Sequence, residues 1–430
     1  MSSLYFDYNA TAPLCESAKI ALTNNLGICG NPASIHTHGR AARQRFEEAR
    51  QTLAHLIKAG RFDDIIFNSS GTEGNNTVLH TFAALCDSAK DSESDQNVLI
   101  VTSGIEHPCI LNSLKELQDH KTLTKEILPV TKNGQIDCDV LVSVLDEYKT
   151  RHPLATILIS CMWVNNETGV VQPLSRVIEI AKSFGAYVHS DIVQGLGRLP
   201  FSLDLYPLDY ATLSAHKIGG LTGFGALYRK AKTPYTPLIY GGGQEKNHRS
   251  GTSNMMGAVA FHNALLDCDP TKWDRIKTLR DSLEQDILSF CPEAKIWGHE
   301  SPRVANTSCI MMPGIEGLTQ VMSFDLDHIS VSAGSACSSG KVAPSHVLKA
   351  MGCSDEEALN SIRVSLPPNA TKDDVDRFVA VWKKIYTRCQ SKMTQTKTTL
   401  AETTLAKTVN TKSETKTKTD RNATIHNDFK

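Results

Sequence analysis

A lysine near the middle of the chain occupies a position where it could act as a nucleophile. Lys217 follows an apolar strand predicted at Tyr210–Leu213 and precedes Gly219 and Gly220. A lysine held in a pocket at a strand end can form a Schiff base with an aldehyde cofactor. A surface lysine after a strand would have the same local sequence, so the interpretation depends on the groups that accompany it.

An aspartate ends an earlier apolar stretch. Asp191 closes Tyr187-Val188-His189-Ser190-Asp191, 26 residues before Lys217. Pyridoxal 5′-phosphate (PLP) needs a carboxylate against its pyridine nitrogen, because the protonated ring absorbs electrons from a substrate carbanion. Gln194 could reach the phenolic oxygen of the same ring. Alternatively, Asp191 is a helix N-cap and Gln194 an ordinary residue of the first helical turn.

A turn of small residues supplies a third part. The string Asn68-Ser69-Ser70-Gly71-Thr72-Glu73-Gly74-Asn75 joins a predicted strand to a helix that begins near Glu73. Free backbone N–H groups and the positive end of the helix dipole bind phosphate readily at such a turn. Together with Lys217 and Asp191, the turn predicts the phosphate cup of one cofactor.

The elements around these residues alternate between strand and helix. Helical periodicity is present in Gly39–Ala59 and Leu174–Phe184. This alternation favours an α/β domain with a mostly parallel sheet, and continuous apolar strands fit a sheet covered on both faces. Strands are predicted at Asp64–Phe67, Val98–Thr102, Thr156–Met162, Ala186–His189, Tyr210–Leu213 and Gly225–Tyr228.

The pattern changes after about Met256 and predicts a smaller α+β domain. The last part of the chain is rich in Thr and Lys and too poor in apolar residues to fold alone. We expect a large domain over residues 14–256, a small domain over 1–13 and 257–388, and a disordered tail over 389–430. In the small domain, helices are predicted at Gly257–Leu266, Pro270–Phe290 and Lys372–Tyr386, and strands at Asn306–Met311, Ile329–Ser332 and Ser361–Leu366.

Composition and charge narrow the class of protein. The 430 residues, 40% hydrophobic and 21% charged, suffice for two globular domains. The net charge of -1 gives no strong attraction to nucleic acid or membrane. No apolar run reaches the ~20 residues that span a bilayer, and Met1–Ala10 has no secretory signal pattern. We therefore expect a cytoplasmic protein with no nucleic-acid or membrane partner.

The twelve cysteines are scattered, and none forms a C-x-x-C pair. This spacing disfavours an intrinsic metal site and a disulfide framework. Most should be small buried hydrophobic residues, as Cys161 is expected to be. Cys337 differs, because the small residues around it, from Ser332 to Gly340, are typical of a loop. A buried structural cysteine remains the alternative.

Several separated strings, in order from about Leu4 to about Tyr386, resemble those of the NifS/IscS cysteine desulfurases. The resemblance rests on Tyr5-Phe6-Asp7-Tyr8-Asn9-Ala10-Thr11-Ala12-Pro13, Gly30-Asn31-Pro32-Ala33-Ser34, Glu106-His107, Val164-Asn165-Asn166-Glu167-Thr168-Gly169, Ser214-Ala215-His216-Lys217, Gly241-Gly242-Gly243-Gln244-Glu245, Arg249-Ser250-Gly251-Thr252 and Ser335-Ala336-Cys337-Ser338-Ser339-Gly340. It implies a fold-type I PLP enzyme of the aspartate-aminotransferase kind, working as a homodimer.

The resemblance also implies roles for matching residues. Lys217 would hold PLP covalently, Asp191 would pair with the pyridine nitrogen, and Gln194 would bond the ring oxygen. His107 would stack on the ring and move protons. The phosphate would be held by Gly71, Thr72, Ser214 and His216, together with Thr252 of the partner subunit.

Substrate recognition is expected from Arg363 and Asn166, the latter also lining the cofactor site. A planar guanidinium matches a carboxylate with two hydrogen bonds. By their local sequence alone, Arg363 could be a surface charge on an edge strand and His107 a cap for the turn before Pro108. Cys337 resembles the nucleophile that accepts the sulfur.

The implied reaction converts L-cysteine to L-alanine and leaves a persulfide on Cys337, for iron–sulfur cluster or other cofactor synthesis. The chain would need no metal of its own, although Cys337 could ligate a transferred iron–sulfur cluster. The acceptor protein is not identified, and the tail bears no likeness to the segment that docks the scaffold protein in the IscS branch. Selenocysteine lyase, an aminotransferase and a non-enzymatic assembly subunit are the alternatives. Gly71, Gly74 and Ile192 stand where relatives usually have other residues, and we expect them only to tune the site.

Overall fold

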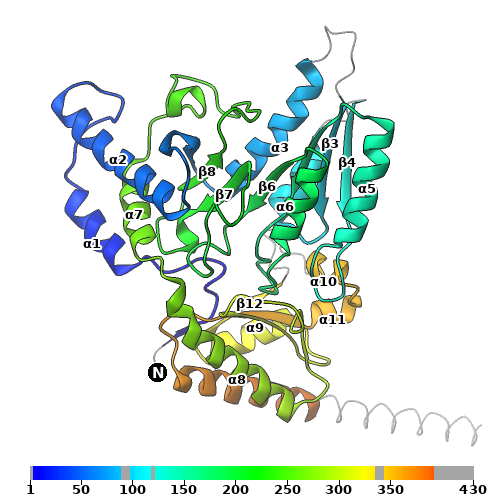
Figure 1. The fold of residues 1–430 in the computed structure, drawn as a ribbon. Helices are drawn as coiled ribbons and strands as arrows, with labels where there is room; N and C mark the ends of the chain where they lie inside the picture. The colour runs from blue at the N-terminus through cyan, green and yellow to red at the C-terminus, as the bar shows by residue number, and fades with distance from the viewer. Residues whose placement is uncertain (1–2, 89–96, 118–121, 335–342, 392–430) are drawn as a thin grey trace, which may run out of the picture.

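The computed structural model describes residues 3–88, 97–117, 122–334 and 343–391. Cys337 and the predicted tail beyond 391 lie outside these ranges. A seven-stranded sheet forms the larger part of the molecule (Figure 1). Its strands, in spatial order, are β2 (Ile65–Asn68), β8 (Gly225–Arg229), β7 (Tyr210–Ser214), β6 (Tyr187–Asp191), β5 (Thr156–Ser160), β3 (Val98–Ser103) and β4 (Leu123–Leu128). Only β8 runs antiparallel to its neighbours, so the predicted mostly parallel sheet is confirmed.

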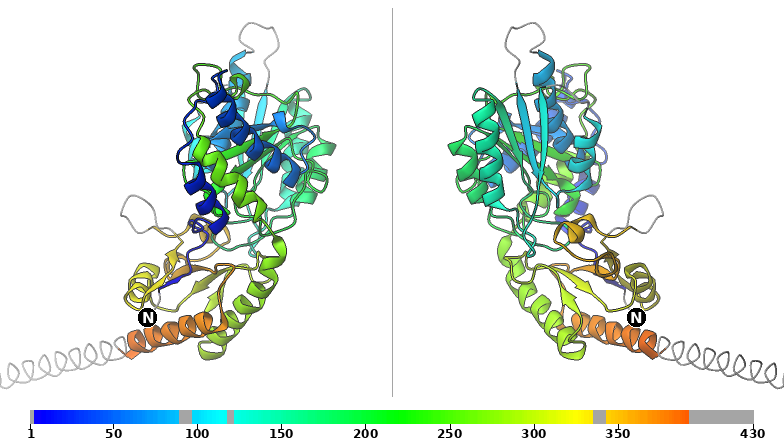
Figure 2. Two further views of the ribbon diagram at one scale, coloured as in Figure 1. Left: turned by 90° about the vertical axis from the view of Figure 1, so that its left-hand side faces the viewer. Right: turned by 90° about the vertical axis from the view of Figure 1, so that its right-hand side faces the viewer.

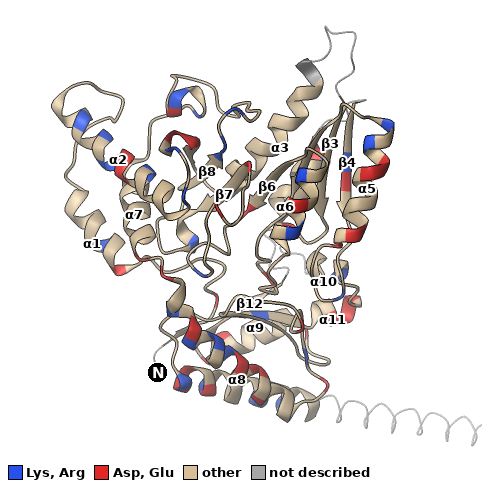
Figure 3. Cartoon of the chain, in the orientation of Figure 1, with Lys and Arg blue, Asp and Glu red and all other residues tan. Residues whose placement is uncertain are grey.

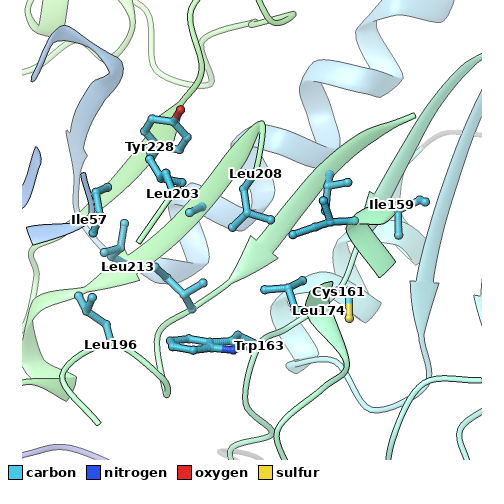
Figure 4. Packing of buried hydrophobic residues seen from close by; sticks show 14 of the residues in the cluster. Ile57, Ile159, Cys161, Trp163, Leu174, Leu196, Leu203, Leu208, Leu213 and Tyr228 are labelled. Atoms are coloured by element: carbon cyan, nitrogen blue, oxygen red, sulfur yellow. The ribbon is translucent and has the colours of Figure 1, made fainter. Parts of the chain in front are cut away.

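Helices cover both faces of this sheet because its apolar side chains alternate between them. Leu99 and Val101 of β3 pack in one cluster, while Val98 and Ile100 pack in another on the opposite face. The first face carries α2 (Thr37–Leu56), α5 (Cys138–Arg151), α6 (Leu174–Ser183) and α7 (Met255–Leu266), and the second carries α3 (Gly71–Ser88) and α4 (Pro108–Glu116). Figure 4 shows side chains of the first cluster, Trp163 and Leu213 among them.

A third hydrophobic cluster surrounds a four-stranded sheet, which lies below the seven-stranded sheet in Figure 1. Its strands are β12 (Ser332–Ala333), β13 (Ser361–Ser365), β10 (Thr307–Met311) and β9 (Lys295–Ile296). Helix α8 (Asp274–Phe290) and the last described helix, 372–391, pack against it on the side away from the larger sheet (Figure 2). The remaining helices are α1 (Glu16–Asn25), α9 (Gly317–Leu326), α10 (His346–Ala350) and α11 (Asp355–Leu359).

The N-terminal segment belongs to this lower part of the molecule. Strand β1 (Leu4–Tyr5) pairs in parallel with β11 (Ile329–Ser330), and Phe6 is buried in the same cluster as α8. We propose that the first residues and those from about Pro270 onward form one small domain; α7, which was expected in this domain, packs instead in the first cluster of the larger sheet. Acidic and basic residues are interspersed along the outer helices, as on α5, α6 and α8 (Figure 3).

Two predicted elements are divided in the structure. The strand predicted at Ile329–Ser332 is two strands, because β11 pairs with β1 whereas β12 pairs with β13 of the other sheet. The helix predicted at Pro270–Phe290 begins as a 3-10 turn, Pro270–Trp273, before α8. None of the helices in the described ranges is long and apolar enough to cross a membrane.

Candidate active site

Strands β6 and β7 end beside a pocket of about 370 Å³. It is lined by all the predicted cofactor and substrate residues except Thr252: Gly71, Thr72, His107, Asn166, Asp191, Gln194, Ser214, His216, Lys217 and Arg363. Thr252 is exposed and does not line the pocket of its own chain, where the sequence analysis assigned it to the partner's site. The sequence motifs therefore converge, although they are scattered over most of the chain.

Lys217 is a half-buried residue whose amine is held by the N-terminal segment. It ends the short 3-10 turn Ala215–Lys217 that follows β7, and its Nζ donates to Asn9 O (2.6 Å) and Ala10 O (2.8 Å). Burial, with Arg363 and Arg198 nearby, lowers its pKa to about 7. Lys217 is thus not the surface lysine that its local sequence allowed.

Asp191 is buried at the end of β6, and no helix begins there. The Asn75 amide donates to its Oδ2 over 2.7 Å, and the Val193 N–H donates to its Oδ1 over 3.0 Å. Residues 192–197 form turns, so the alternatives of an N-cap at Asp191 and a helical Gln194 are wrong. A Cβ at Gly195 would lie 2.1 Å from the Trp163 ring, so this turn requires glycine where it crosses the ring.

The predicted phosphate cup lies at the first turn of α3. The helix begins at Gly71, two residues earlier than expected, and Gly71 and Thr72 of its first turn line the pocket. A Cβ at Gly71 would lie 3.1 Å from Val193 Cγ2, which leaves little space for a side chain. Nδ1 of His216 lies 3.1 Å from Thr11 Oγ1, and burial lowers the pKa of His216 to about 4.

Arg363 is on β13, an interior strand of the small sheet. Its side chain is 10% exposed; Nη2 donates to Asp7 Oδ1 (2.7 Å) and Nη1 to Asn166 O (3.2 Å). Its Nε–H has no partner among the described residues. The alternative of an edge-strand surface charge is therefore wrong, and the guanidinium keeps N–H groups for a ligand carboxylate beyond the two that bond Asp7 and Asn166.

His107 is exposed to solvent as a residue, although neighbouring groups desolvate its ring, and it caps α4. Its Nδ1 accepts a hydrogen bond from the Cys109 N–H over 3.2 Å, so in the neutral ring the proton is on Nε2. Desolvation of the ring lowers the pKa of His107. The capping role and a catalytic role are compatible, because the cap occupies only one ring nitrogen.

These groups fit PLP. The pocket joins a lysine of lowered pKa, a buried carboxylate and a helix N-terminus, which match the aldehyde, the pyridine nitrogen and the phosphate of that cofactor. Asn75 Oδ1 is also buried without a hydrogen-bond partner among the described residues. The hydrogen-bonding groups that line the pocket thus match a ligand with several polar groups.

The family model described as "Aminotransferase class-V" matches residues 4–378. The chain belongs to the class V aminotransferases. Within this family it is 36% identical over 382 residues to a cysteine desulfurase of Cereibacter sphaeroides, covering 89% of this chain and 95% of that one. The structure is similar to that of a NifS-like protein from Rickettsia africae, with 33% identity, a TM-score of 0.79 and coverage of 90% of this chain and 99% of that one. A structure of SspA in complex with cysteine has 26% identity, a TM-score of 0.72 and coverage of 86% and 100%.

Sequence reasoning missed several residues of the site. Asn9 and Ala10 contact Lys217 through their carbonyls, and Asn75 holds Asp191. Asn75 is one turn along α3 from Gly71, so helical spacing could have found it. Carbonyl contacts leave no signal in residue type, although Asn9 is within a string that carried the family resemblance.

Proposed function

We propose that this class V enzyme is a PLP-dependent cysteine desulfurase. It converts L-cysteine to L-alanine and passes the sulfur to Cys337, for iron–sulfur cluster or other sulfur-containing cofactor synthesis. The observation that carries the proposal is the convergence of the Lys217 amine, the Asp191 carboxylate and the first turn of α3 on one pocket that also contains Arg363. The naming of similar chains as cysteine desulfurases supports the choice of substrate.

When bound, PLP would supply the electron sink that makes the substrate Cα–H acidic. Lys217 would hold its aldehyde carbon, Asp191 its pyridine nitrogen, and the first turn of α3 with Ser214 and His216 its phosphate. A lysine with a pKa of about 7 is largely neutral at physiological pH and is therefore a competent nucleophile. The N–H donors of Asn75 and Val193 hold the Asp191 carboxylate in place at the end of β6.

The substrate carboxylate would bind Arg363, whose Nε–H is unpaired among the described groups. The neighbouring Asp7 and Asn166 carbonyl fix the guanidinium plane. His107 is neutral near pH 7, since its pKa is lowered, and would take or return a proton beside the ring.

The sulfur step needs a thiol. The Cys337 thiolate attacks the substrate sulfur, an S–S bond forms as the C–S bond breaks, and the carbon gains a proton to become the alanine methyl group. The products are L-alanine and a Cys337 persulfide, so atoms balance without an external oxidant. A reductant or acceptor thiol then removes the terminal sulfur.

We further propose a cytoplasmic homodimer in which Thr252 of the partner subunit completes the phosphate site. An acceptor protein is expected but not identified. The test of the whole proposal is alanine and sulfide release from L-cysteine by the purified, PLP-loaded protein, with and without dithiothreitol. Alanine without Cys337 persulfide would point to another reaction, and no alanine at all would overturn the assignment.

A further inference from the structure

One buried cation behind the pocket, Arg198, has no counter-ion among the described residues. Arg198 is 4% exposed, and no described carboxylate forms an ion pair with it. Its Nη2 is buried with no hydrogen-bond partner in the described part of the chain. Burying a guanidinium without a carboxylate partner lowers the stability of the fold. The presence of Arg198 at this position therefore calls for a function.

The side chain that Arg198 contacts is a predicted cofactor ligand. Nη1 donates to Gln194 Oε1 over 2.6 Å and to Gln194 O over 3.2 Å. A guanidinium has no acceptor, so the amide oxygen of Gln194 must face Arg198 and the amide NH2 must face away. That NH2 donates one hydrogen to Asn9 O over 3.0 Å, and the second remains for the pocket that Gln194 lines.

Two aromatic rings hold the guanidinium in this position. Its central carbon lies 5.8 Å from the Tyr8 ring centroid and 5.9 Å from that of Trp273. The Trp273 indole in turn donates to Gly197 O over 2.7 Å, next to Arg198 in the chain. The contact with Gln194 is therefore braced by the N-terminal segment and by the residue that precedes α8.

We propose that Arg198 is a positioning residue that acts through Gln194. It fixes the amide so that Gln194 can only donate into the pocket, and its positive charge strengthens that donor. The matching ligand group is an anionic ring oxygen, the phenolic oxygen of the proposed cofactor. The inference rests on the proposed function for the identity of that ligand, but not on the desulfurase reaction.

The test is equilibrium binding to the apo-protein, with PLP and with 3-deoxypyridoxal 5′-phosphate, which lacks the phenolic oxygen. The ratio of the two dissociation constants is measured for wild type, Arg198→Met, Gln194→Met and the double variant. Because both dissociation constants are measured in the same variant, a loss of affinity that affects both ligands equally leaves their ratio unchanged. A hydrogen bond to a charged group leads us to expect each single variant to lose on the order of 10-fold of the preference for PLP.

The double variant should lose no more than either single variant, because the two residues act as one unit. Arg198→Lys, which keeps a charged donor, should retain part of the preference. Gln194→Glu keeps a partner for Arg198 but offers no N–H to the pocket, so it should lose the preference even if Arg198→Met does not fold. Arg280→Met is the matched control, since Arg280 is a buried cation bonded to Asp281 that does not line the pocket.

An unchanged ratio in Arg198→Met, or losses that add in the double variant, would overturn the coupling to Gln194. An unchanged ratio in Gln194→Glu would do the same. If the wild-type apo-protein binds neither aldehyde, the proposed cofactor is wrong and this inference fails with it. If it binds both but releases no alanine from cysteine, only the proposed reaction fails.

Discussion

The hydroxyl of Ser345 donates a hydrogen bond to Glu167 Oε2 over 2.5 Å. Glu167 is buried next to Asn166, and burial raises its pKa. A Cβ on Gly334 would lie 2.8 Å from the same oxygen. The Glu167 carboxylate thus lies close to both Gly334 and Ser345, which flank the stretch that contains Cys337.

This relationship predicts that Ser345→Ala slows sulfur transfer without weakening cofactor binding, because the lost bond anchors the residues that follow Cys337. We expect a fall of about 10-fold in kcat, the effect of leaving one buried acceptor unpaired. The measurement is alanine formation alongside the absorbance of bound PLP. Ser354→Ala is the matched control, since Ser354 caps α11 as Ser345 caps α10 but does not contact Glu167. Equal losses in both variants would assign the effect to helix capping.

Lys217→Ala should remove covalent PLP attachment and all turnover, because no other lysine lines the pocket in the described part of the chain. Absorbance spectroscopy of the purified variant and an alanine assay measure both effects. Lys230→Ala, an exposed lysine one strand away, should behave as wild type. Retained activity in the Lys217 variant would show that Lys217 is not the nucleophile.

The lowered pKa of Lys217 predicts a pH dependence. Only the neutral amine reacts with an aldehyde, so the rate at which apo-protein takes up PLP should rise with pH and level off above about 7. An unperturbed lysine would keep gaining rate up to about 10.4. Stopped-flow absorbance over pH 5.5–8.5, about 1.5 units on either side of the shifted pKa, separates the two cases.

Asp191→Ala should fold but lose on the order of 100-fold or more in kcat, because no other acidic residue among those described lines the pocket to keep the pyridine nitrogen protonated. Asp191→Asn keeps the shape and the volume and should be similarly slow. Steady-state alanine formation measures both. A rate near wild type in Asp191→Asn would show that the charge is not required.

Cys337→Ala separates the desulfurase from the selenocysteine lyase alternative. The variant should bind PLP and cysteine but release almost no sulfur, because a thiolate must draw the sulfur off. Selenium leaves more easily, so alanine should still form from selenocysteine. Parallel assays with the two substrates decide the matter. Full activity of the variant on cysteine would make Cys353 or Cys309 the candidate sulfur acceptor.

The fold was predictable where apolar character is continuous. Strands β3 and β7 are buried along their whole length and β6 at every residue but its first, and all three were found within two residues of their bounds. Strand β4 was missed because it lies at the sheet edge. Glu126 and Ile127 are exposed there, and the charged pair Lys125-Glu126 breaks the apolar run. Residue type alone could not divide Ile329–Ser332, since the division depends on which strands lie nearby.

The site was predictable where chemistry requires a particular residue type. Lys217, Asp191 and Arg363 were found in this way, and they line one pocket. Asp7 and Arg198 were not, because their roles come from contacts that only the folded chain creates. Asp7 meets Arg363 across 356 positions of sequence, and no local pattern encodes such a pair.

That separation has a consequence for biosynthesis. Lys217 and the carbonyls of Asn9 and Ala10 emerge from the ribosome early, but Asp7 has no guanidinium partner until Arg363 has been translated and has left the exit tunnel. Domains generally fold during synthesis as their residues appear. The larger sheet can therefore form on the nascent chain, whereas the substrate-binding half of the pocket is completed only after Arg363 has emerged.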